Sequence, residues 1–267
     1  MTAVLDALCD GAVVARRNLI KIKRVPELLV FTTIQPIMFI LLFAFVFGSA
    51  IDLEGIDYRE FLIAGIFAQT VVFGATFTGA GIADDMQKGI IDRFRSLPMS
   101  RSSVLIGRTA SDIVLNALSV TVMSLTGLLV GWRIRESFLE AVAGFALLLL
   151  FSYAISWVMA YVGLLVPTPE VVQNASFVIL FPATFIADTF VPSDDFPGVL
   201  RTIAHWNPVS TLTQATRELF GNTSPLMPVA DAWPMQHPVL YTLLWVVGIL
   251  AVFVPLATWQ YKRAASR

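Results

Sequence analysis

Residues 89–108 read "GIIDRFRSLPMSRSSVLIGR" and carry four arginines within an otherwise apolar chain. The apolar residues of this stretch recur at helical spacing, at positions 90, 91, 94 and 97. The spacing predicts a short amphipathic helix with a single apolar stripe. Pro98 ends that helix, because the residue before a proline is disfavoured in the helical conformation. A serine at 100, 102 or 103 can cap the next helix, which we expect to begin near Val104.

The composition around this stretch is typical of an integral membrane protein. The 267 residues are 57% hydrophobic and only 14% charged, and their mean hydropathy is +0.76. Soluble domains are about one quarter charged. The single cysteine, Cys9, excludes an intrachain disulfide, and His205 and His237 lack the spacing of a ligand motif. We therefore expect no metal site.

Six apolar segments are long enough to cross a membrane, which takes about 20 helical residues. They are residues 28–50, 61–83, 104–131, 138–166, 171–187 and 239–259. The first is longer than the apolar region of a signal peptide, about 7–15 residues, so we interpret it as a retained span. Pro182 interrupts the fifth, and its end is the least defined boundary. The sequence thus predicts an all-α integral membrane protein with six transmembrane helices.

The positive charges predict the orientation of these spans. Thirteen of the 18 lysines and arginines precede the first span, separate the second from the third, or follow the sixth. Cytoplasmic loops carry such an excess of lysine and arginine. We therefore expect both termini and the loop 84–103 to be cytoplasmic, in a plasma (inner) membrane.

Two further regions are expected to form amphipathic helices beside the spans. Residues 1–27 are too polar to cross the bilayer and predict an interfacial helix on the inner leaflet, with a cytoplasmic helix packed on the bundle as the alternative. Residues 188–236 are divided by prolines and turn residues. Apolar faces at 196–203 and 209–220 predict two short helices on the outer side, each half-buried.

Three interpretations of the basic stretch compete. It can anchor the loop to anionic lipid, bind nucleic acid, or insert into a groove of a soluble partner with Phe94 and Leu97 as anchors. Nucleic-acid binding is disfavoured, because no recognition motif or second basic cluster adjoins the stretch. The residues alone leave the lipid anchor and the partner contact both open.

The stretch closely resembles the cytoplasmic loop of type-2 ABC exporter permeases, in particular the daunorubicin-resistance and multidrug-efflux branch. A second similarity lies downstream in residues 190–220, "FVPSDDFPGVLRTIAHWNPVSTLTQATRELF". With the predicted spans around them, the two similarities cover essentially the whole chain. One departure concerns the acid that many relatives carry just before the loop glycine, where this chain reads "DDMQKG" with Asp84 and Asp85 slightly earlier.

The resemblance implies a division of labour between subunits. Residues 28–267 would form the permease domain, and this chain would pair with a second copy or with a homologous permease. Two cytoplasmic ATP-binding subunits would bind ATP and Mg²⁺. No cofactor is expected in this chain, because its sequence contains no G-x-x-x-x-G-K-[ST] phosphate-binding motif. The contacts would come from the N-terminal helix and from a coupling helix at 84–98. The contact residues implied are Arg16, Arg17, Ile91, Asp92, Arg93, Phe94, Arg95, Leu97 and Pro98.

Aromatic residues at helical spacing on the second and fifth predicted spans are candidates for a cargo path. They share a face with a few polar residues: Gln69, Phe73, Thr76 and Phe77 on the second, and Asn174, Phe177, Phe181 and Phe185 on the fifth. Ordinary helix packing is the alternative. The main ionisable candidates near the spans are Asp112 and Asp188. On the outer side, Arg201, Arg217 and Glu218 are candidates for a gate, with structural ion pairing as the alternative.

Three functions remain to be compared. The first is the membrane subunit of an ATP-driven exporter for a hydrophobic or amphiphilic drug, natural product or lipid. The second is a secondary carrier or lipid-handling membrane protein, which usually shows an acid or a broken helix near the middle of the membrane. The third, an intramembrane enzyme, is disfavoured because no suitable arrangement of nucleophile, base and acid is evident in the sequence.

Overall fold

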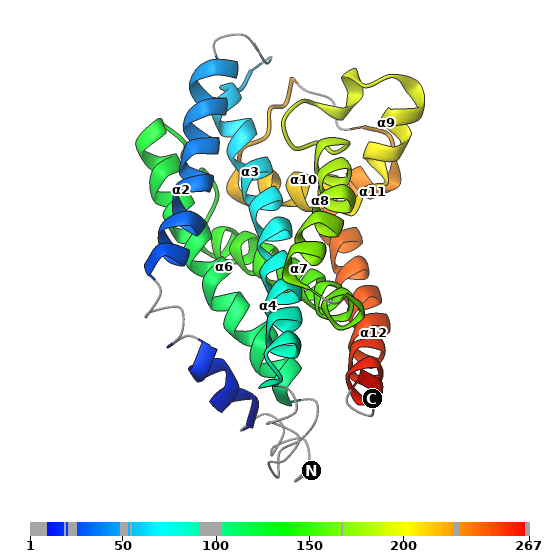
Figure 1. Cartoon of the computed structure of the whole chain (residues 1–267). Coiled ribbons are helices and arrows are strands. Elements are labelled where there is room, and N and C mark those ends of the chain that lie inside the picture. Colours follow the sequence, from blue (N-terminus) through cyan, green and yellow to red (C-terminus); the bar gives the residue numbers. More distant parts are fainter. Residues whose placement is uncertain are drawn as a thin grey trace.

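The computed structural model describes residues 10–18, 20, 26–48, 53, 55–90, 103–166, 168–226 and 230–264. Within these ranges the regular structure consists only of helices (Figure 1). Four helical stretches are long and apolar enough to cross a membrane: Tyr58–Gln87, Ser103–Val130, Phe138–Leu165 and Pro238–Arg263. The chain is therefore an all-helical, multi-pass membrane protein. A count of six spans stays a prediction.

The first apolar segment forms α2, Pro26–Leu42, which continues as the π-helix η1, Phe43–Phe47. The expected segment was 28–50. Its apolar stretch Ile34–Phe47 is shorter than a full span. Phe43 of η1 stacks on Phe47 at 4.9 Å between ring centroids and on Phe190 at 4.6 Å. These rings attach the end of α2 to the segment that follows the fifth apolar helix.

The second apolar segment forms α3, Tyr58–Gly74, and α4, Thr76–Gln87, joined by Ala75 in a helical conformation. The pair is longer than the expected 61–83, and Asp84 and Asp85 lie in the last turn of α4. Residues 84–87 of the expected coupling helix 84–98 thus belong to α4, and its residues 91–98 lie outside the described residues, so the coupling helix stays a prediction. Lys88 stabilises this extra turn through an ion pair with Asp84 at 2.7 Å, which also raises the pKa of Lys88. Gly89 then ends the helix at φ +64°, a conformation that glycine adopts without strain.

The next two long helices are α6, Ser103–Val130, and α7, Phe138–Leu165. Ser137 and Glu140 cap the start of α7 by reciprocal hydrogen bonds. The shorter α8, Pro169–Phe185, begins with a Thr168 cap and a proline in its first turn. Pro182 lies inside α8 and not at its end, and the helix continues for three more residues, until Ile186 N donates to the Pro182 carbonyl at 2.8 Å.

The segment between α8 and α12 contains η2, Ser193–Asp195, and then α9, Gly198–His205, α10, Pro208–Phe220, and α11, Trp233–Gln236. The two amphipathic helices expected here exist, but they are not equally buried. In α9 only Ala204 is buried, whereas most of α10 is, including five of its polar side chains and Arg217. Because α10 packs against α3, α7 and α12 at once, most of its surface is covered, and Glu218 near its end is exposed.

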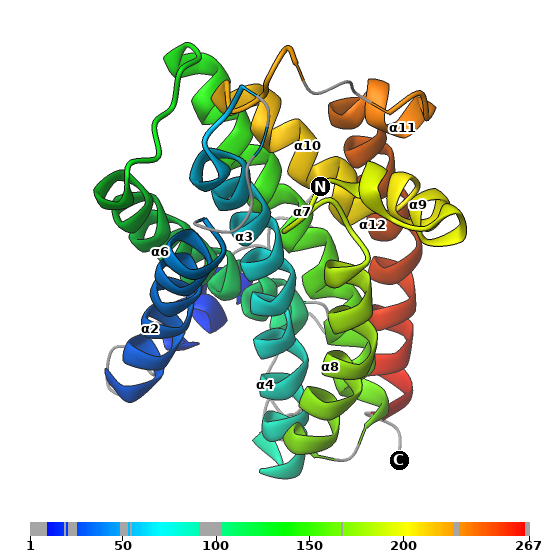
Figure 2. The same ribbon diagram turned by 90° about the horizontal axis from the view of Figure 1, so that it is seen from above.

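The last helix, α12, Pro238–Ala264, lies along α7 (Figures 1 and 2). The core centres on α3, where Phe67 makes edge-to-face contacts with Trp132, Phe145 and Phe220 at 5.5 to 6.1 Å. Gly221, at φ +69°, ends α10 and turns the chain so that Asn222 accepts a hydrogen bond of 2.6 Å from Trp132 Nε1. The buried indole is thereby satisfied, and α10 is fixed to the α6–α7 connection.

Candidate functional site

A cavity of about 380 Å³ lies among α2, α3, α4, α6 and α8. In Figure 2, α3 and α4 separate α2 and α6 on one side from α8 on the other. Six of the side chains that line the cavity are phenyl rings, and eight others carry an amide or a hydroxyl group. Such a mixture binds an apolar body and leaves a few polar atoms to orient it.

Seven of the eight residues predicted for a cargo path line this one cavity. From α3 and α4 they are Gln69, Phe73, Thr76 and Phe77, and from α8 they are Phe177, Phe181 and Phe185. The exception is Asn174, which is exposed, while its neighbour Gln173 lines the cavity. Phe177, Phe181 and Phe185 form a stack with centroid distances of 4.9 and 4.1 Å. Their role in transport stays a prediction.

Of the two walls that α2 and α6 provide, sequence reasoning identified only Asp112, as an ionisable candidate near the spans. Gln35, Pro36 and Phe39 come from α2. The α6 wall consists of Asp112, Leu115, Asn116 and Ser119. Three of these α6 residues are polar and recur at steps of four and three, a periodic stripe that a search for polar spacing could have found.

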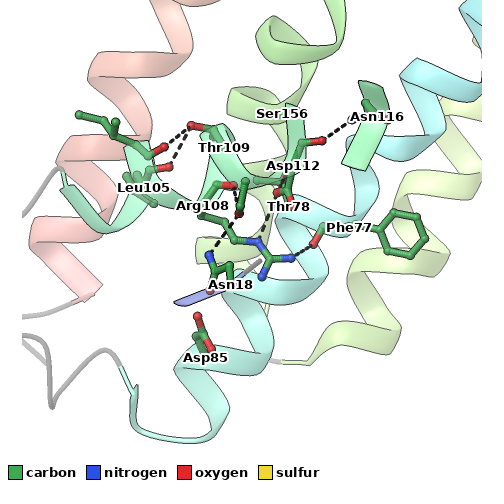
Figure 3. Close-up of polar contacts among 12 residues, drawn as sticks. Asn18, Phe77, Thr78, Asp85, Leu105, Arg108, Thr109, Asp112, Asn116 and Ser156 are labelled. Carbon is green, nitrogen blue, oxygen red and sulfur yellow. Dashed lines mark hydrogen bonds and ion pairs between the residues drawn. The ribbon is translucent and has the colours of Figure 1, made fainter. Parts of the chain in front are cut away.

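The polar end of the cavity is organised around Asp112, which is only 1% exposed (Figure 3). Its Oδ2 atom accepts a hydrogen bond of 2.6 Å from Thr78 Oγ1 and one of 3.3 Å from Arg108 Nε. Arg108 also donates to the Phe77 carbonyl at 2.8 Å. One turn along α6, Asn116 Nδ2 donates to the Asp112 carbonyl at 3.1 Å. The network ties α6 to the first turn of α4.

The N-terminal helical residues 10–18 contact the same two helices. Arg17 donates to Asp85 of α4 at 3.1 Å, and Asn18 Nδ2 donates to Ser111 Oγ of α6 at 3.2 Å. Arg16 is exposed. The other predicted contacts to an ATPase lie outside the described residues: Ile91, Asp92, Arg93, Phe94, Arg95, Leu97 and Pro98.

The three residues predicted for an outer gate do not form one cluster. Arg217 is buried and pairs with Asp188, and its guanidinium lies 3.5 Å from the centre of the Phe61 ring. Burial lowers the pKa of Arg217, and the charge of Asp188 opposes that shift. Arg201 donates to the Phe196 carbonyl at 3.2 Å, and Glu218 accepts from Gln214 at 3.1 Å. For Arg217, the buried pair with Asp188 fits the alternative to a gate, which is structural ion pairing.

The described residues contain no group of three His, Cys, Asp or Glu side chains that could hold a metal ion. The chemistry of the cavity is therefore discussed through its hydrogen-bonding groups and its aromatic walls.

Comparison with known proteins gives one consistent result. A family model described as ABC-2 type transporter matches residues 12–220. A daunorubicin resistance ABC transporter permease, DrrB1 of Streptomyces coeruleorubidus, is 30% identical over 92% of this chain and 83% of its own length. A probable doxorubicin resistance ABC transporter permease, DrrC of Mycobacterium tuberculosis, is 26% identical over 87% of this chain and 81% of its own. A probable multidrug ABC transporter permease of Escherichia coli, YbhR, is 21% identical over 67% of this chain and 49% of its own.

Proposed function

This chain belongs to the ABC-2 type transporter family, and from that premise we propose that it exports a hydrophobic or amphiphilic compound as the permease subunit of an ABC transporter. The printed names of its relatives refer to resistance against daunorubicin and doxorubicin and to multidrug transport. Permeases of this family work with separate ATP-binding subunits. ATP hydrolysis is therefore assigned to a partner chain.

The cavity among α2, α3, α4, α6 and α8 carries this proposal. Its volume of about 380 Å³ is within the range of small-molecule sites. Its phenyl walls suit a compound with a large apolar surface, and its amides and hydroxyls suit a compound with a few polar groups. The cargo would bind there and leave when the helices around it move.

The proposed topology has six spans, formed by α2 with η1, α3 with α4, α6, α7, α8 and α12. The span formed by α8 is the shortest. Its 17 residues extend about 26 Å, slightly less than the hydrocarbon core of about 30 Å. Both termini and the loop after α4 would face the cytoplasm, with the chain in the plasma membrane. Interfacial placement of the N-terminal helix is supported by its exposed Val13 and Ile20 beside the buried Val14.

The proposed assembly contains two permease chains and two ATP-binding subunits. The arginine-rich stretch that follows Ile90 would dock on the ATPase, with Phe94 and Leu97 in a groove and arginines around it. The N-terminal helix would provide a second contact through the exposed Arg16. Because Arg17 and Asn18 bond to α4 and α6, a movement of this helix would act directly on two walls of the cavity.

A secondary carrier is the second candidate, and one observation favours it. Asp112 is a buried acid in the apolar helix α6 and lines a cavity, and buried acids within spans are what proton-coupled carriers use. Its pairing with Arg108 opposes that role, because the arginine offsets the charge that such coupling requires.

The test begins with isolation of the chain in detergent from its native membranes. We expect a stoichiometric phosphate-loop ATPase to co-purify, and inside-out vesicles with both proteins to accumulate an amphiphilic dye only with ATP. If no ATPase co-purifies and a protonophore abolishes dye accumulation, the exporter proposal fails and the carrier replaces it.

A further inference from the structure

One carboxylate oxygen of Asp112, Oδ1, receives no hydrogen bond from the residues that the structure describes. Its Oδ2 atom receives both the Thr78 hydroxyl and Arg108 Nε. No donor among the described residues reaches Oδ1, although this atom is buried and its residue lines the cavity. Buried polar atoms are normally hydrogen-bonded, so an exception in a cavity requires an explanation.

Arg108 cannot supply the missing donor in the conformation observed. Its terminal nitrogen donates to the Phe77 carbonyl at 2.8 Å, which holds the guanidinium along α4 and away from Oδ1. Gly81 makes this position possible, because a Cβ atom there would lie 2.2 Å from Arg108 Cζ. The backbone of α4 thus fixes the arginine on one side of the carboxylate (Figure 3).

A second residue that lines the cavity also has a buried polar atom without a hydrogen-bond partner among the described residues. Thr76 Oγ1 is buried, and among the described residues it has no hydrogen-bond partner. Thr76 lines the cavity at the start of α4, two residues before the Thr78 hydroxyl that binds Asp112. The cavity therefore offers an acceptor and a hydroxyl, one from α6 and one from α4.

The remaining walls determine what kind of molecule carries the complementary group. Phe73 of α3 lies 6.2 Å from Phe177, the first ring of the α8 stack. Phenyl faces bind flat apolar ring systems, and they also tolerate a nearby cation.

We propose that the cavity selects ring-containing amphiphiles with an N–H or O–H donor, that Asp112 Oδ1 accepts this donor, and that Thr76 assists. The inference rests on the proposed function of the cavity as the cargo site. A protonated amine makes the strongest of these contacts, because its hydrogen bond to a carboxylate is assisted by charge.

Three pyrene derivatives of similar size test the proposal: 1-pyrenemethylamine, 1-pyrenemethanol and 1-methylpyrene. Their binding to the permease–ATPase complex in lipid nanodiscs is measured by fluorescence polarisation, with empty nanodiscs subtracted. We expect both donor probes to bind about tenfold more tightly than 1-methylpyrene, the ratio for one hydrogen bond to a charged group. If only 1-pyrenemethylamine binds more tightly than 1-methylpyrene, the cavity requires a charged donor and does not select neutral alcohols.

Asp112→Asn should bring the donor probes to within about twofold of 1-methylpyrene, because the amide oxygen lacks the charge that strengthens the bond. Thr76→Val, which keeps the shape of the side chain, should reduce the preference in part. Thr121→Val is the matched control, since Thr121 is exposed on α6 and does not line the cavity, and it should leave the preference unchanged.

The outcomes separate this inference from the proposed function. A donor preference that survives in both Asp112→Asn and Thr76→Val overturns the assignment of these residues. Equal binding of the three probes to the wild type, with all of them weakened by Phe181→Ala, overturns donor selection and retains the cavity as the cargo site. Binding of none of the probes overturns the cargo site itself.

Discussion

Arg217 of α10 and Asp188 of the segment after α8 form an ion pair in which both side chains are almost completely buried. Arg217 also donates to the Asp188 carbonyl at 2.7 Å and to the Phe61 carbonyl at 3.0 Å, and its guanidinium stacks on the Phe61 ring. One side chain thus joins α10, α3 and the end of α8.

Arg217→Met should destabilise the protein by about 3–5 kcal/mol, because it leaves the buried Asp188 carboxylate without its cation. The midpoint of thermal unfolding in detergent measures this change. Arg201→Met is the control, since Arg201 is exposed and should shift the midpoint little. Equal midpoints for the two variants would contradict a structural role for the pair.

Gly163→Leu should separate α4 from α7. A Cβ atom on Gly163 would lie 2.3 Å from the Gly79 carbonyl oxygen, so the helices are in backbone contact there. Overpacking of this kind costs about 1–3 kcal/mol, and we expect a lower unfolding midpoint and less folded protein after extraction. Gly248→Leu in α12 is the control, because no atom lies within 4 Å of its added Cβ. Similar losses in both variants would indicate a general effect of leucine.

Phe181→Ala should change which compounds stimulate the ATPase, because it removes the middle ring of the α8 stack. Stimulation by a panel of flat and non-flat amphiphiles is compared with that of the wild type. Val178→Ala, on the same helix but 72% exposed, should keep the wild-type profile. Identical profiles for Phe181→Ala and the wild type would assign the stack to packing alone.

Phe94→Ala should reduce co-purification with the ATPase by at least about tenfold, as expected for an apolar anchor of a protein interface. Membrane insertion should be unchanged. Ser100→Ala, beyond Pro98 in the same loop, is the control. If the ATPase is recovered in wild-type amounts, the lipid-anchor interpretation of the arginine-rich stretch becomes the better one.

The proposed orientation predicts opposite accessibility for two introduced cysteines. In a Cys9→Ser background, Asp92→Cys should react with an impermeant maleimide only in inside-out vesicles, and Asp194→Cys only in right-side-out vesicles. Labelling from the reverse sides would overturn the topology. Asp194 is exposed in the segment between α8 and α12, so burial does not complicate the measurement.

Hydropathy locates the long helices well, because their length and apolar character are local properties. The pattern predicts helices from 104 and 138, and α6 and α7 begin at Ser103 and Phe138. The ends of α4 and α12 are predicted less well. Helix α12 continues to Ala264, past the expected residue 259, because Lys262 and Arg263 are good helix formers that a hydropathy scale does not register.

The cavity and the buried ion pair depend on contacts distant in sequence, and they were predictable to different degrees. The spacing of the phenylalanines predicts the α8 wall of the cavity, because all the rings of that wall belong to one helix. The burial of Arg217 could not be predicted from the amphipathic pattern of its helix. Such a pattern assigns every arginine to the polar, exposed face. Its partners are 29 and 156 residues away, and only the packing of α10 against three helices brings them together.

The ion pair also has a consequence for the order in which the chain is synthesised. Phe61 and Asp188 both precede Arg217 in the chain, so both emerge from the ribosome before the arginine does. The positive charge of α10 can be neutralised as soon as that helix emerges. The contact between Thr211 and Thr242 has to wait for α12, which is made last. The last helix, α12, therefore packs against α10 after both Arg217 and its partner Asp188 have been synthesised.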